Sequence, residues 1–547
     1  MVSVDNGENA GDVVARICDA RAQSLERLKT QDFDVVVIGG GITGAGALLE
    51  AASRGYRAAL IEASDFASGT SSASSKLIHG GLRYLSQGEI GLVYQNLSER
   101  THLLKNAPGL VSRLPFVIPI PRHRFGIGSM TRLSYSAALW GYDLTGGMRN
   151  GQLHSSLALS DVKSMFAHLD TSRFSSSFLY HDAWADDARL VLAVINLARS
   201  LGAIALNYVE AQPGVLGSSS KIAAIGASSK NCGDPTLFQT GFEISTKSVI
   251  NATGVGAQKF LEEAELCGSI SIRPAKGVHV AFRNETLATR VGAVLPVPGE
   301  KRTIFVLPWG QHSYVGTTDT DVGSGALATE VADLNYLLEA LNSSLDVELN
   351  LNDISGAWVG ARPLVDSAKP NKSLPTRTHD LSRRHRIITS KSGVIFVIGG
   401  KLTTFRQMAQ DCIDALDSQM SRKTKSISTS LAIVDPYLKM QRDFNGGATS
   451  ADEGDEPKTR WRISASEINY MVEHLDALEL SDILMRRTRV GILDRRDALD
   501  LSKGVLRTLA KTLQLSQREQ ESTLLAFHRE LDTNFPPQLT HRPNIGE

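Results

Sequence analysis

DVVVIGGGITGAGALLEAASRGYRAALIE, residues 34–62, is the stretch of sequence that predicts the fold. An apolar run leads into a glycine-rich turn, a helix of small residues follows, and a second apolar run ends on an acid. This is the order of a βαβ unit that binds a dinucleotide. In such a unit Gly39 permits the tight turn, Gly41 lets the backbone approach a pyrophosphate, and Gly44 lets the helix pack closely on the strand. The sequence therefore predicts a nucleotide-binding unit rather than a chance turn.

The same stretch indicates how the nucleotide is held. We expect the pyrophosphate at the helix N-terminus, where free N–H groups and the helix dipole favour negative charge. Glu62 ends the second strand, where a carboxylate can accept hydrogen bonds from ribose hydroxyls. Far downstream, another predicted strand, residues 248–254, also ends on a glycine, Gly254. The chain has no second GxGxxG motif. A long cofactor held by distant segments fits this pattern better than NAD, so the sequence predicts FAD.

Composition bounds the class of protein. At 547 residues the chain exceeds one core, so two or three domains are expected. Lys+Arg and Asp+Glu both total 58, which gives no indication of a nucleic-acid partner. The four cysteines have no CxxC spacing, so we expect a reducing cytosol and no metal site or disulfide framework. No apolar run approaches the ~18 residues of a spanning helix, and no signal-peptide core is visible.

The pattern of elements predicts an α/β (α+β) fold: a Rossmann-like FAD-binding domain, a substrate domain built on a mixed or antiparallel sheet, and a helical C-terminal domain. The FAD-binding domain is expected to be discontinuous, over about residues 32–105, 180–255 and 355–420. The substrate domain is expected over about 106–179 and 256–354. Outside this region we expect a polar, helical extension at 1–31, a linker at 421–458 and the helical domain at 459–547.

Within these domains the periodicity predicts individual elements. The N-terminal extension should contain a helix, around residues 13–28, that packs on the body of the protein rather than anchoring it to a membrane. Apolar runs predict strands at 204–209, 222–225, 278–282, 304–307, 314–318 and 394–400. Helices are expected at 189–202 and from about Thr403, the latter with Phe405, Met408 and Cys412 on its inner face.

The segment SGTSSASSKLIHGGLRY, residues 68–84, concentrates hydroxyls, glycines and basic or imidazole groups. Such a loop can bind pyrophosphate oxygens and the polar edge of a flavin, and two adjacent glycines let backbone lie against a flat ring. His79, Arg83 and Tyr84 would then face the substrate. The alternative is a flexible serine loop. The cofactor-binding residues expected here are Thr70, Ser71, Ser72, Ser75, Lys76, Leu77, Gly80 and Gly81.

Further basic residues stand at or near glycine or proline turns far apart in the chain: Lys276, His279, Arg362, Arg383 and Lys401. Each alone is more often a solvated surface charge. Together they predict a cationic pocket for an anion, in which an Arg fork suits a phosphate bidentately and Lys supplies a point charge.

Lys401 lies between a strand that ends on two glycines and the start of a helix. The N-terminus of that helix could stabilise negative charge on the pyrimidine edge of a reduced flavin. The alternative, compatible with the first, is that its threonines only cap the helix. The cofactor-binding residues expected here are Gly399, Gly400, Leu402, Thr403 and Thr404.

These segments make the chain resemble the FAD-dependent, quinone-linked glycerol-3-phosphate dehydrogenase family over about residues 30–520. The matching motifs are IGGGITGAG at 38–46, SGTSSASSKLIHGGLRYL at 68–85, VGTTDTD at 315–321, GARPL at 360–364, GGKLTTFRQMA at 399–409 and DILMRRTRVGILDRR at 482–496. Leu48 and Glu50 depart from the usual Ala and Asp, and Phe405 replaces a common Tyr, but none of these positions belongs to the expected chemistry.

The resemblance implies that FAD oxidises sn-glycerol 3-phosphate to dihydroxyacetone phosphate: the carbinol hydrogen leaves as hydride and a base takes the hydroxyl proton. Carried over by position, Arg83, Arg383 and Lys401 hold the phosphate or the glycerol arm. Tyr84 and the catalytic set His79, His279 and Arg362 surround the alcohol. We expect a histidine as the base, because an unperturbed imidazole has a pKa near ~6.5, with Arg362 as its electrostatic partner.

Two rivals share this flavin fold: a glycerol-3-phosphate oxidase that uses oxygen, and an amine or amino-acid oxidase in which Arg362 grips a carboxylate. A non-catalytic FAD-binding scaffold is a third alternative. The quinone route implies a cytoplasmic protein held peripherally on the inner face of the cell membrane. Its expected docking surfaces are the basic runs Arg122–Arg124 (with His123) or Arg486, Arg487 and Arg489. From the family position we also expect a homodimer formed through the C-terminal domain.

Overall fold

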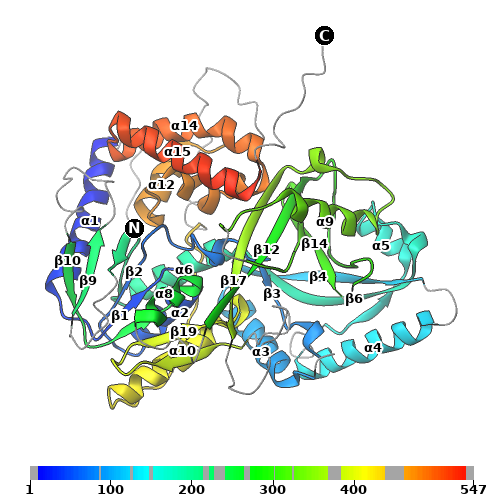
Figure 1. Ribbon diagram of the computed structural model, residues 1–547, viewed down its shortest axis with the longest axis horizontal. Coiled ribbons are helices and arrows are strands. Elements are labelled where there is room, and N and C mark those ends of the chain that lie inside the picture. The colour runs from blue at the N-terminus through cyan, green and yellow to red at the C-terminus, as the bar shows by residue number, and fades with distance from the viewer. Residues whose placement is uncertain are drawn as a thin grey trace, which may run out of the picture.

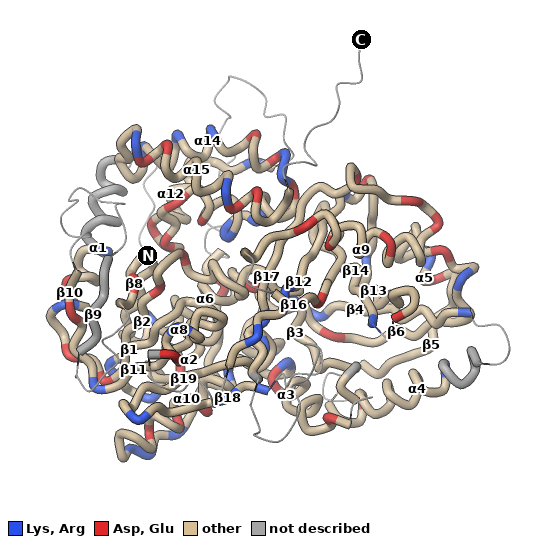
Figure 2. Tube along the Cα trace, in the orientation of Figure 1, with Lys and Arg blue, Asp and Glu red and all other residues tan. Residues whose placement is uncertain are grey.

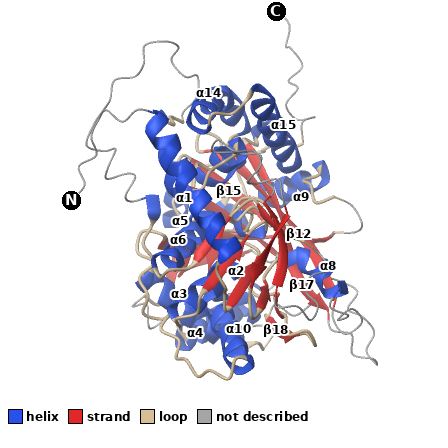
Figure 3. Ribbon diagram, turned by 90° about the vertical axis from the view of Figure 1, so that its left-hand side faces the viewer, coloured by secondary structure: helices blue, strands red, loops and turns tan. Residues whose placement is uncertain are grey.

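Two large sheets stand side by side in the computed structural model, and a group of C-terminal helices covers one end of both (Figure 1). In the view turned by a quarter, helices flank the strands on both sides (Figure 3). The residues that the structure describes are 10–85, 88–122, 127–146, 152–212, 221–226, 241–263, 271–300, 302–322, 326–366, 384–437 and 461–536.

The first sheet contains the predicted βαβ unit. Its strand order is β18-β19-β11-β1-β2-β7, parallel throughout except for the antiparallel β18–β19 pair. Buried on both faces, its central strands are continuous apolar runs, as expected of a covered parallel sheet. The strands are β1 Val35–Ile38, β2 Ala58–Ile61, β7 Ile204–Leu206, β11 Val249–Asn251, β18 Arg386–Thr389 and β19 Ile395–Ile398.

Helices α2 (Ile42–Ser53), α6 (Asp187–Ser200) and α10 (Phe405–Gln419) pack together beside this sheet. Leu48 and Glu50, the two residues of α2 that differ from the family pattern, take part in that packing. Leu48 is fully buried, and Glu50 forms a buried ion pair with Arg54 at 2.7 Å. Arg54 also pairs with Asp417 of α10 at 3.1 Å. The expected inner face of α10 is confirmed, because Phe405, Met408, Ala409, Cys412 and Leu416 are all buried.

The prediction of one strand over residues 204–209 is wrong, because the strand found there is shorter. β7 ends at Leu206, and β8 (Val209–Ala211) belongs to a separate three-stranded sheet with β9 (Lys221–Gly226) and β10 (Gly241–Ser245). Tyr208 has a φ of +55°, which turns the chain out of the first sheet. Its hydroxyl donates to Asp482 at 2.7 Å, so a tertiary contact accompanies the turn.

The second sheet is mixed, as expected, with a strand order of β16-β12-β15-β14-β13-β4-β6-β3. β17 pairs with β12, β5 pairs with β6, and only the β13–β4 pair is parallel. Its strands are β3 Leu77–Ile78, β4 Val111–Pro121, β5 Ser155–Leu157, β6 Phe174–Ala185, β12 Ser271–Arg283, β13 Gly292–Pro296, β14 Thr303–Trp309, β15 His312–Gly316, β16 Thr320–Asp321 and β17 Gly356–Asp366. The helices around it are α3 Ile90–Asn106, α4 Ile127–Thr145, α5 Leu159–Met165 and α9 Val331–Asn342.

The C-terminal part of the chain is helical, as predicted. Serine–glutamate capping boxes begin α12 and α15, at Ser464 and Ser516. Its hydrophobic side chains belong to the same buried cluster as those of β1 and α10. The elements are α12 Ala465–Leu475, the π-helical segment η9 Asp482–Arg487, α13 Val490–Leu493, α14 Arg495–Leu513 and α15 Gln517–Asn534.

The basic run at the start of this region is not a docking surface, so that prediction is wrong. Arg486, Arg487 and Arg489 are 5%, 5% and 3% exposed. Arg486 and Arg487 bind Asp65 at 2.6 and 2.7 Å, and Arg489 binds Asp186 at 2.6 Å. The physical reason is that these guanidinium groups neutralise buried carboxylates of the nucleotide unit.

The segments that flank the two sheets also pack on the body. Helix α1 (Ala10–Thr30) buries Leu25 and Leu28, and its Arg21 donates to Asn207 at 2.9 Å. In the expected linker, residues 438–458 lie outside the described part, whereas Tyr437 is buried. Among the described helices, none is both long and apolar enough to cross a membrane.

Candidate active site

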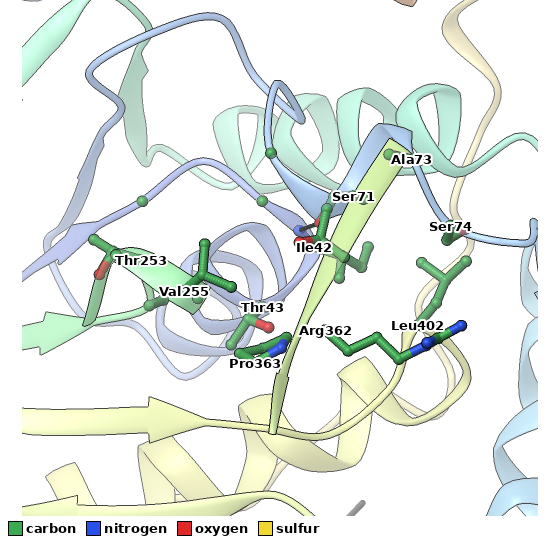
Figure 4. A pocket seen from close by; sticks show the side chains of 18 of the residues that line it. Ile42, Thr43, Ser71, Ala73, Ser74, Thr253, Val255, Arg362, Pro363 and Leu402 are labelled. Carbon is green, nitrogen blue, oxygen red and sulfur yellow. Dashed lines mark hydrogen bonds between the residues drawn. The ribbon is translucent and has the colours of Figure 1, made fainter. Parts of the chain in front are cut away.

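A cavity of about 570 Å³ lies where the carboxyl ends of β1, β2 and β11 meet the long strands of the second sheet. This is the edge at which ligands of open α/β sheets bind. Figure 4 shows Thr253 and Val255 at one end of it, with Arg362 and Leu402 at the other. The helical turns η1 (Thr70–Ser72), η5 (Gly254–Gly256) and η8 (Leu402–Thr404) complete the wall.

The β1 turn gives the nucleotide end of the cavity the features that FAD requires. Gly39 has a φ of +110°, and a Cβ on Gly44 would lie 1.8 Å from the carbonyl oxygen of Gly39. Both positions therefore demand glycine. The Glu62 carboxylate accepts from the N–H groups of Gly40 at 2.6 Å and Ser64 at 2.8 Å, which fixes it at the end of β2. An adenosine and a pyrophosphate fit these residues.

The serine loop contributes only part of its side chains to the cavity. Ser71 accepts from the Ile42 N–H at 2.9 Å, at the N-terminus of α2, and Thr70 donates to the Ala361 carbonyl at 2.6 Å. Lys76 is turned away from the cavity and fully buried, with Nζ 3.1 Å from Asp187. Burial lowers the pKa of Lys76 to about 8, although Asp187 opposes the shift.

Arg362 lies at the end of the cavity opposite the nucleotide turn. It extends from β17, and its guanidinium donates to Thr317 Oγ1 at 3.2 Å and pairs with Asp319 at 3.2 Å. Lys401 Nζ lies 4.0 Å from the centroid of the Tyr84 ring, which brings two predicted substrate residues together. Lys276 does not join them, because it forms a buried ion pair with Asp333 at 2.8 Å.

The two histidines of the cavity have different surroundings. His279 is 3% exposed, its ring stacks on Trp358 at 4.9 Å, and Nε2 shares a 2.8 Å hydrogen bond with Ser75 Oγ. Its Nδ1 is enclosed and has no hydrogen-bond partner within the described residues. Burial, together with the charges of Lys76 and Arg362, holds the pKa of His279 well below its usual value.

His79 is only partly buried. Its backbone N–H donates to Thr403 Oγ1 at 3.2 Å, which ties the serine loop to the turn before α10. His79 is among the residues that line the cavity.

The structure brings most of the predicted site residues to one cavity. Those that line it are Gly39, Gly41, Glu62, Thr70, Ser71, Ser75, Leu77, His79, Tyr84, Gly254, His279, Arg362, Gly399, Gly400, Lys401, Leu402 and Thr403. Those that do not line it are Gly44, Ser72, Lys76, Gly80, Gly81 and Thr404. The Arg83 side chain and the whole of Arg383 lie outside the described residues, so of the three residues expected to hold the phosphate or the glycerol arm only Lys401 is described in full.

Several lining residues escaped the sequence analysis. Thr43 is the second residue of α2, and Lys259 lies in the short helix α8 (Ala257–Glu263), which comes after β11 in the chain. Thr317 and Gly360 stand inside motifs that were recognised, VGTTDTD and GARPL, but they carry no charge that would have singled them out. No group of three or more His, Cys, Asp or Glu suited to a metal ion occurs among the described residues.

Comparison with known proteins agrees with this geometry. Residues 34–406 match the family of FAD dependent oxidoreductases, and residues 440–520 match the C-terminal domain of alpha-glycerophosphate oxidase. The chain is 36% identical to a glycerol-3-phosphate dehydrogenase of Mycobacterium leprae, over 86% of this chain and 83% of the relative. It is 32% identical to glycerol-3-phosphate dehydrogenase 2 of Mycobacterium tuberculosis, over 90% of this chain and 87% of the relative.

A solved structure shares the fold. The glycerol-3-phosphate dehydrogenase of Bacillus halodurans, complexed with FAD, superposes with a TM-score of 0.72 at 22% identity, over 95% of this chain and 98% of that one. The family matches cover most of the chain, and the cavity fits the cofactor that the family uses. This chain therefore belongs to the FAD-dependent glycerol-3-phosphate dehydrogenase family, with FAD as its cofactor.

Proposed function

We propose that the chain oxidises sn-glycerol 3-phosphate to dihydroxyacetone phosphate and passes the electrons to a membrane quinone. The observation that carries the proposal is one cavity with the glycine turn of β1 at one end and Arg362, Lys401 and two histidines at the other. The names of the mycobacterial relatives support the same substrate. FAD, when bound, supplies a two-electron acceptor for the hydride of the carbinol carbon.

The cofactor would be held along the whole cavity. We assign the adenosine and pyrophosphate to the β1 turn, Glu62 and the hydroxyls of Thr70 and Ser71, since their N–H and oxygen groups line that end. The turn before α10 would hold the flavin end. There the N-terminus of a 15-residue helix favours negative charge.

The phosphate of the substrate would bind the cationic end. Arg362 would bind the substrate beside the reacting alcohol, because Asp319 and Thr317 fix part of its guanidinium group at the cavity wall. Lys401 would add a point charge beside Tyr84. Arg83 and Arg383 stay in the proposal as further phosphate ligands on the strength of the family resemblance.

We propose His79 as the base. A base must come within hydrogen-bond reach of the substrate hydroxyl. The enclosed Nδ1 of His279 and the bond from its Nε2 to Ser75 leave that ring without a nitrogen open to the cavity. His79 is partly exposed and lines the cavity. Arg362 would stabilise the alkoxide that develops as the proton leaves.

Anaerobic flavin bleaching tests the reaction. We expect sn-glycerol 3-phosphate to bleach the flavin absorbance of the purified protein within the mixing time of a manual assay, and glycerol alone to be ineffective. Bleaching by amino acids instead of the phosphate would favour the amine or amino-acid oxidase. No bleaching with either phosphorylated polyols or amino acids would favour the FAD-binding scaffold.

A second experiment distinguishes quinone from oxygen as the electron acceptor. Oxygen is the alternative because part of the chain matches the C-terminal domain of alpha-glycerophosphate oxidase. The bleached protein is mixed with either air-saturated buffer or an anaerobic quinone analogue, and flavin reoxidation is followed by stopped flow. We expect the quinone analogue to reoxidise the flavin much faster. Faster reoxidation by oxygen, with release of hydrogen peroxide, would contradict the quinone assignment.

A quinone acceptor requires contact with the membrane, and helix α4 offers a surface for it. Leu133, Trp140 and Leu144 recur at helical spacing on one face and are 71%, 50% and 71% exposed. Charged residues are sparse along α4 (Figure 2), and its one acid, Asp143, is buried beside His154. An apolar face with arginines at 122, 124, 132 and 149 nearby in the sequence suits an anionic bilayer.

Vesicle flotation tests this surface. The double change Leu133→Gln and Leu144→Gln should abolish binding to vesicles that contain phosphatidylglycerol, while reduction of a soluble dye is retained. Leu525→Gln is the matched control, since Leu525 is 51% exposed on α15. Unchanged flotation of the double variant would overturn the surface, and a wild-type protein that does not float would overturn the proposed peripheral location on the inner face of the cell membrane.

We also propose that the chain forms a homodimer through its C-terminal helices. The proposal rests on the family resemblance alone. Sedimentation velocity at micromolar concentration should give the mass of a dimer. A monomer under these conditions would contradict it.

A further inference from the structure

Gly80, the residue that follows His79, has its backbone held from three sides. The Gly80 N–H donates to the hydroxyl of Tyr142 at 2.9 Å and to Asp182 at 3.3 Å. The Gly80 carbonyl accepts from the side-chain amide of Asn96 at 2.8 Å. Asn96 comes from α3, Tyr142 from α4 and Asp182 from β6, so three separate elements hold the two peptide units that meet at Gly80.

The side chains that hold the Gly80 backbone form a buried hydrogen-bond network. Tyr142 is 1% exposed and Asp182 is 4% exposed. The Tyr142 hydroxyl donates to Asp182 at 2.7 Å, and Arg100 pairs with the same carboxylate. Tyr142, Asp182 and Arg100 are each hydrogen-bonded to another member of the network, which favours a single arrangement of these three side chains.

Close packing reinforces the hydrogen bonds. A Cβ on Gly80 would lie 2.5 Å from both the Leu97 side chain and the Tyr142 hydroxyl oxygen, so the backbone itself fills the space between α3 and α4. On the other side of His79, its own N–H is bound to Thr403. The histidine is thus anchored at both of its peptide bonds.

We infer that Tyr142 is a positioning residue for the reaction: through the Gly80 peptide it sets where the His79 ring lies in the cavity. The inference rests on the proposed function, in which His79 takes the substrate proton. Tyr142 does not line the cavity, so it acts only through the backbone. Proton transfer depends steeply on donor–acceptor geometry, and a displacement of one ångström can cost a factor of about 100.

Tyr142→Phe tests the inference, because it removes the hydroxyl and keeps the ring. We expect the limiting rate of anaerobic flavin reduction to fall at least about tenfold, with KM and bound FAD unchanged. Tyr180→Phe is the matched control. Tyr180 is 4% exposed, its ring lies 6.0 Å from that of Tyr142, and no hydrogen bond joins its hydroxyl to Gly80 in the described structure. The control should reduce flavin at the wild-type rate.

A double-mutant cycle separates positioning from a general structural effect. In a His79→Gln background, adding Tyr142→Phe should cause no further loss of rate, because the residue it positions is already gone. A further tenfold loss there would show that Tyr142 acts independently of His79 and would overturn the inference. A wild-type rate for Tyr142→Phe alone would do the same. Failure of the proposed function is recognised separately, since the wild-type protein itself would then not be bleached by glycerol 3-phosphate.

Discussion

The two histidines of the cavity differ in what their ring nitrogens can reach. In His279 one nitrogen is bonded to Ser75 and the other is enclosed, and the ring stacks flat on Trp358. The pKa of His279 is held well below the ordinary value by burial and by the neighbouring Lys76 and Arg362, which favours its neutral form. His279 is therefore suited to supporting Ser75 at the cavity wall.

The pH dependence of flavin reduction follows from this difference. A base accepts a proton only when neutral, so the limiting rate should fall as the pH drops through the pKa of the acting imidazole. We expect this acidic limb, between about pH 5.5 and 7.5, in the wild-type protein and in His279→Gln. It should vanish in His79→Gln, together with a rate loss of about 100-fold or more. Stopped-flow absorbance across pH is the measurement, and a limb that persists in His79→Gln would refute the assignment.

Arg362 is expected to act by the shape of its fork as well as by its charge. Arg362→Lys keeps the charge but cannot bind Asp319, Thr317 and a substrate oxygen together, so KM for glycerol 3-phosphate should rise about tenfold or more. Arg273→Lys is the control: Arg273 is similarly exposed (32% against 27%) and pairs with Asp321 at 3.1 Å. Steady-state kinetics with a dye acceptor would measure both. Equal KM values in the two variants would remove Arg362 from the substrate site.

Among the elements, helix α2 depends on how closely it approaches the β1 turn. The turn and the helix N-terminus lie so near each other that a methyl group on Gly44 would collide with the Gly39 carbonyl. By contrast, Gly504 in α14 has nothing within 4 Å of the position where a Cβ would be. The two glycines are both helical, but only one of them is required by packing.

Alanine substitution should therefore have opposite effects at the two glycines. Gly44→Ala should destabilise the protein by about 3 kcal/mol and reduce its FAD content, because the turn must move away from the helix. Gly504→Ala should stabilise it by about 0.5–1 kcal/mol, the difference in helix propensity. Thermal unfolding and flavin absorbance per protein would measure both. A Gly44→Ala protein that keeps full FAD would contradict the requirement for close contact between α2 and the β1 turn.

In the whole molecule, buried charges tie the C-terminal helices to the two sheets. Asp65, at the end of the βαβ unit, is bound by Arg486 and Arg487 of η9. Burial acts to raise the pKa of Asp65, but the two guanidinium groups prevail and lower it. Asp494, before α14, likewise binds Arg283 of β12 at 2.6 Å. The C-terminal region is therefore part of one folded body with the sheets, not an appended module.

Asp494 predicts how stability changes with pH. Burial would raise its pKa, yet His312 and Arg283 lower it to about 2. A carboxylate whose pKa is depressed by folding stabilises the protein above its unfolded pKa, about 3.9, and loses that contribution as the pH falls through about 2. Asp494→Asn should lower the free energy of unfolding by about 1–2 kcal/mol at pH 7, and by less at pH 3.5.

Urea unfolding at the two pH values checks this expectation. Asp500→Asn is the control, because Asp500 is exposed on the same helix. It should leave the unfolding curve unchanged at both values. A deficit in Asp494→Asn that grows as the pH falls would have the wrong sign and would exclude the linkage.

The limits of sequence reasoning are visible at particular residues. Arg486, Arg487 and Arg489 look like a solvated basic run, because a sequence does not show that Asp65 and Asp186 lie against them. Lys76 stands among serines that line the cavity, but its position in the loop does not reveal that its Nζ turns toward the buried Asp187. The turn at Tyr208 is equally hidden, since tyrosine is uncommon at positive φ.

The sequence by itself determined the βαβ unit, the type of each sheet and the family, because these depend on local periodicity, on glycines with fixed roles and on short motifs. Only the tertiary structure decided which polar side chains face the cavity and which form buried ion pairs. That division depends on contacts between residues far apart in the chain, such as Asp65 with Arg487 and Gly80 with Tyr142. The free energy of burying a charge or a peptide group is set by those partners, and local sequence does not contain them.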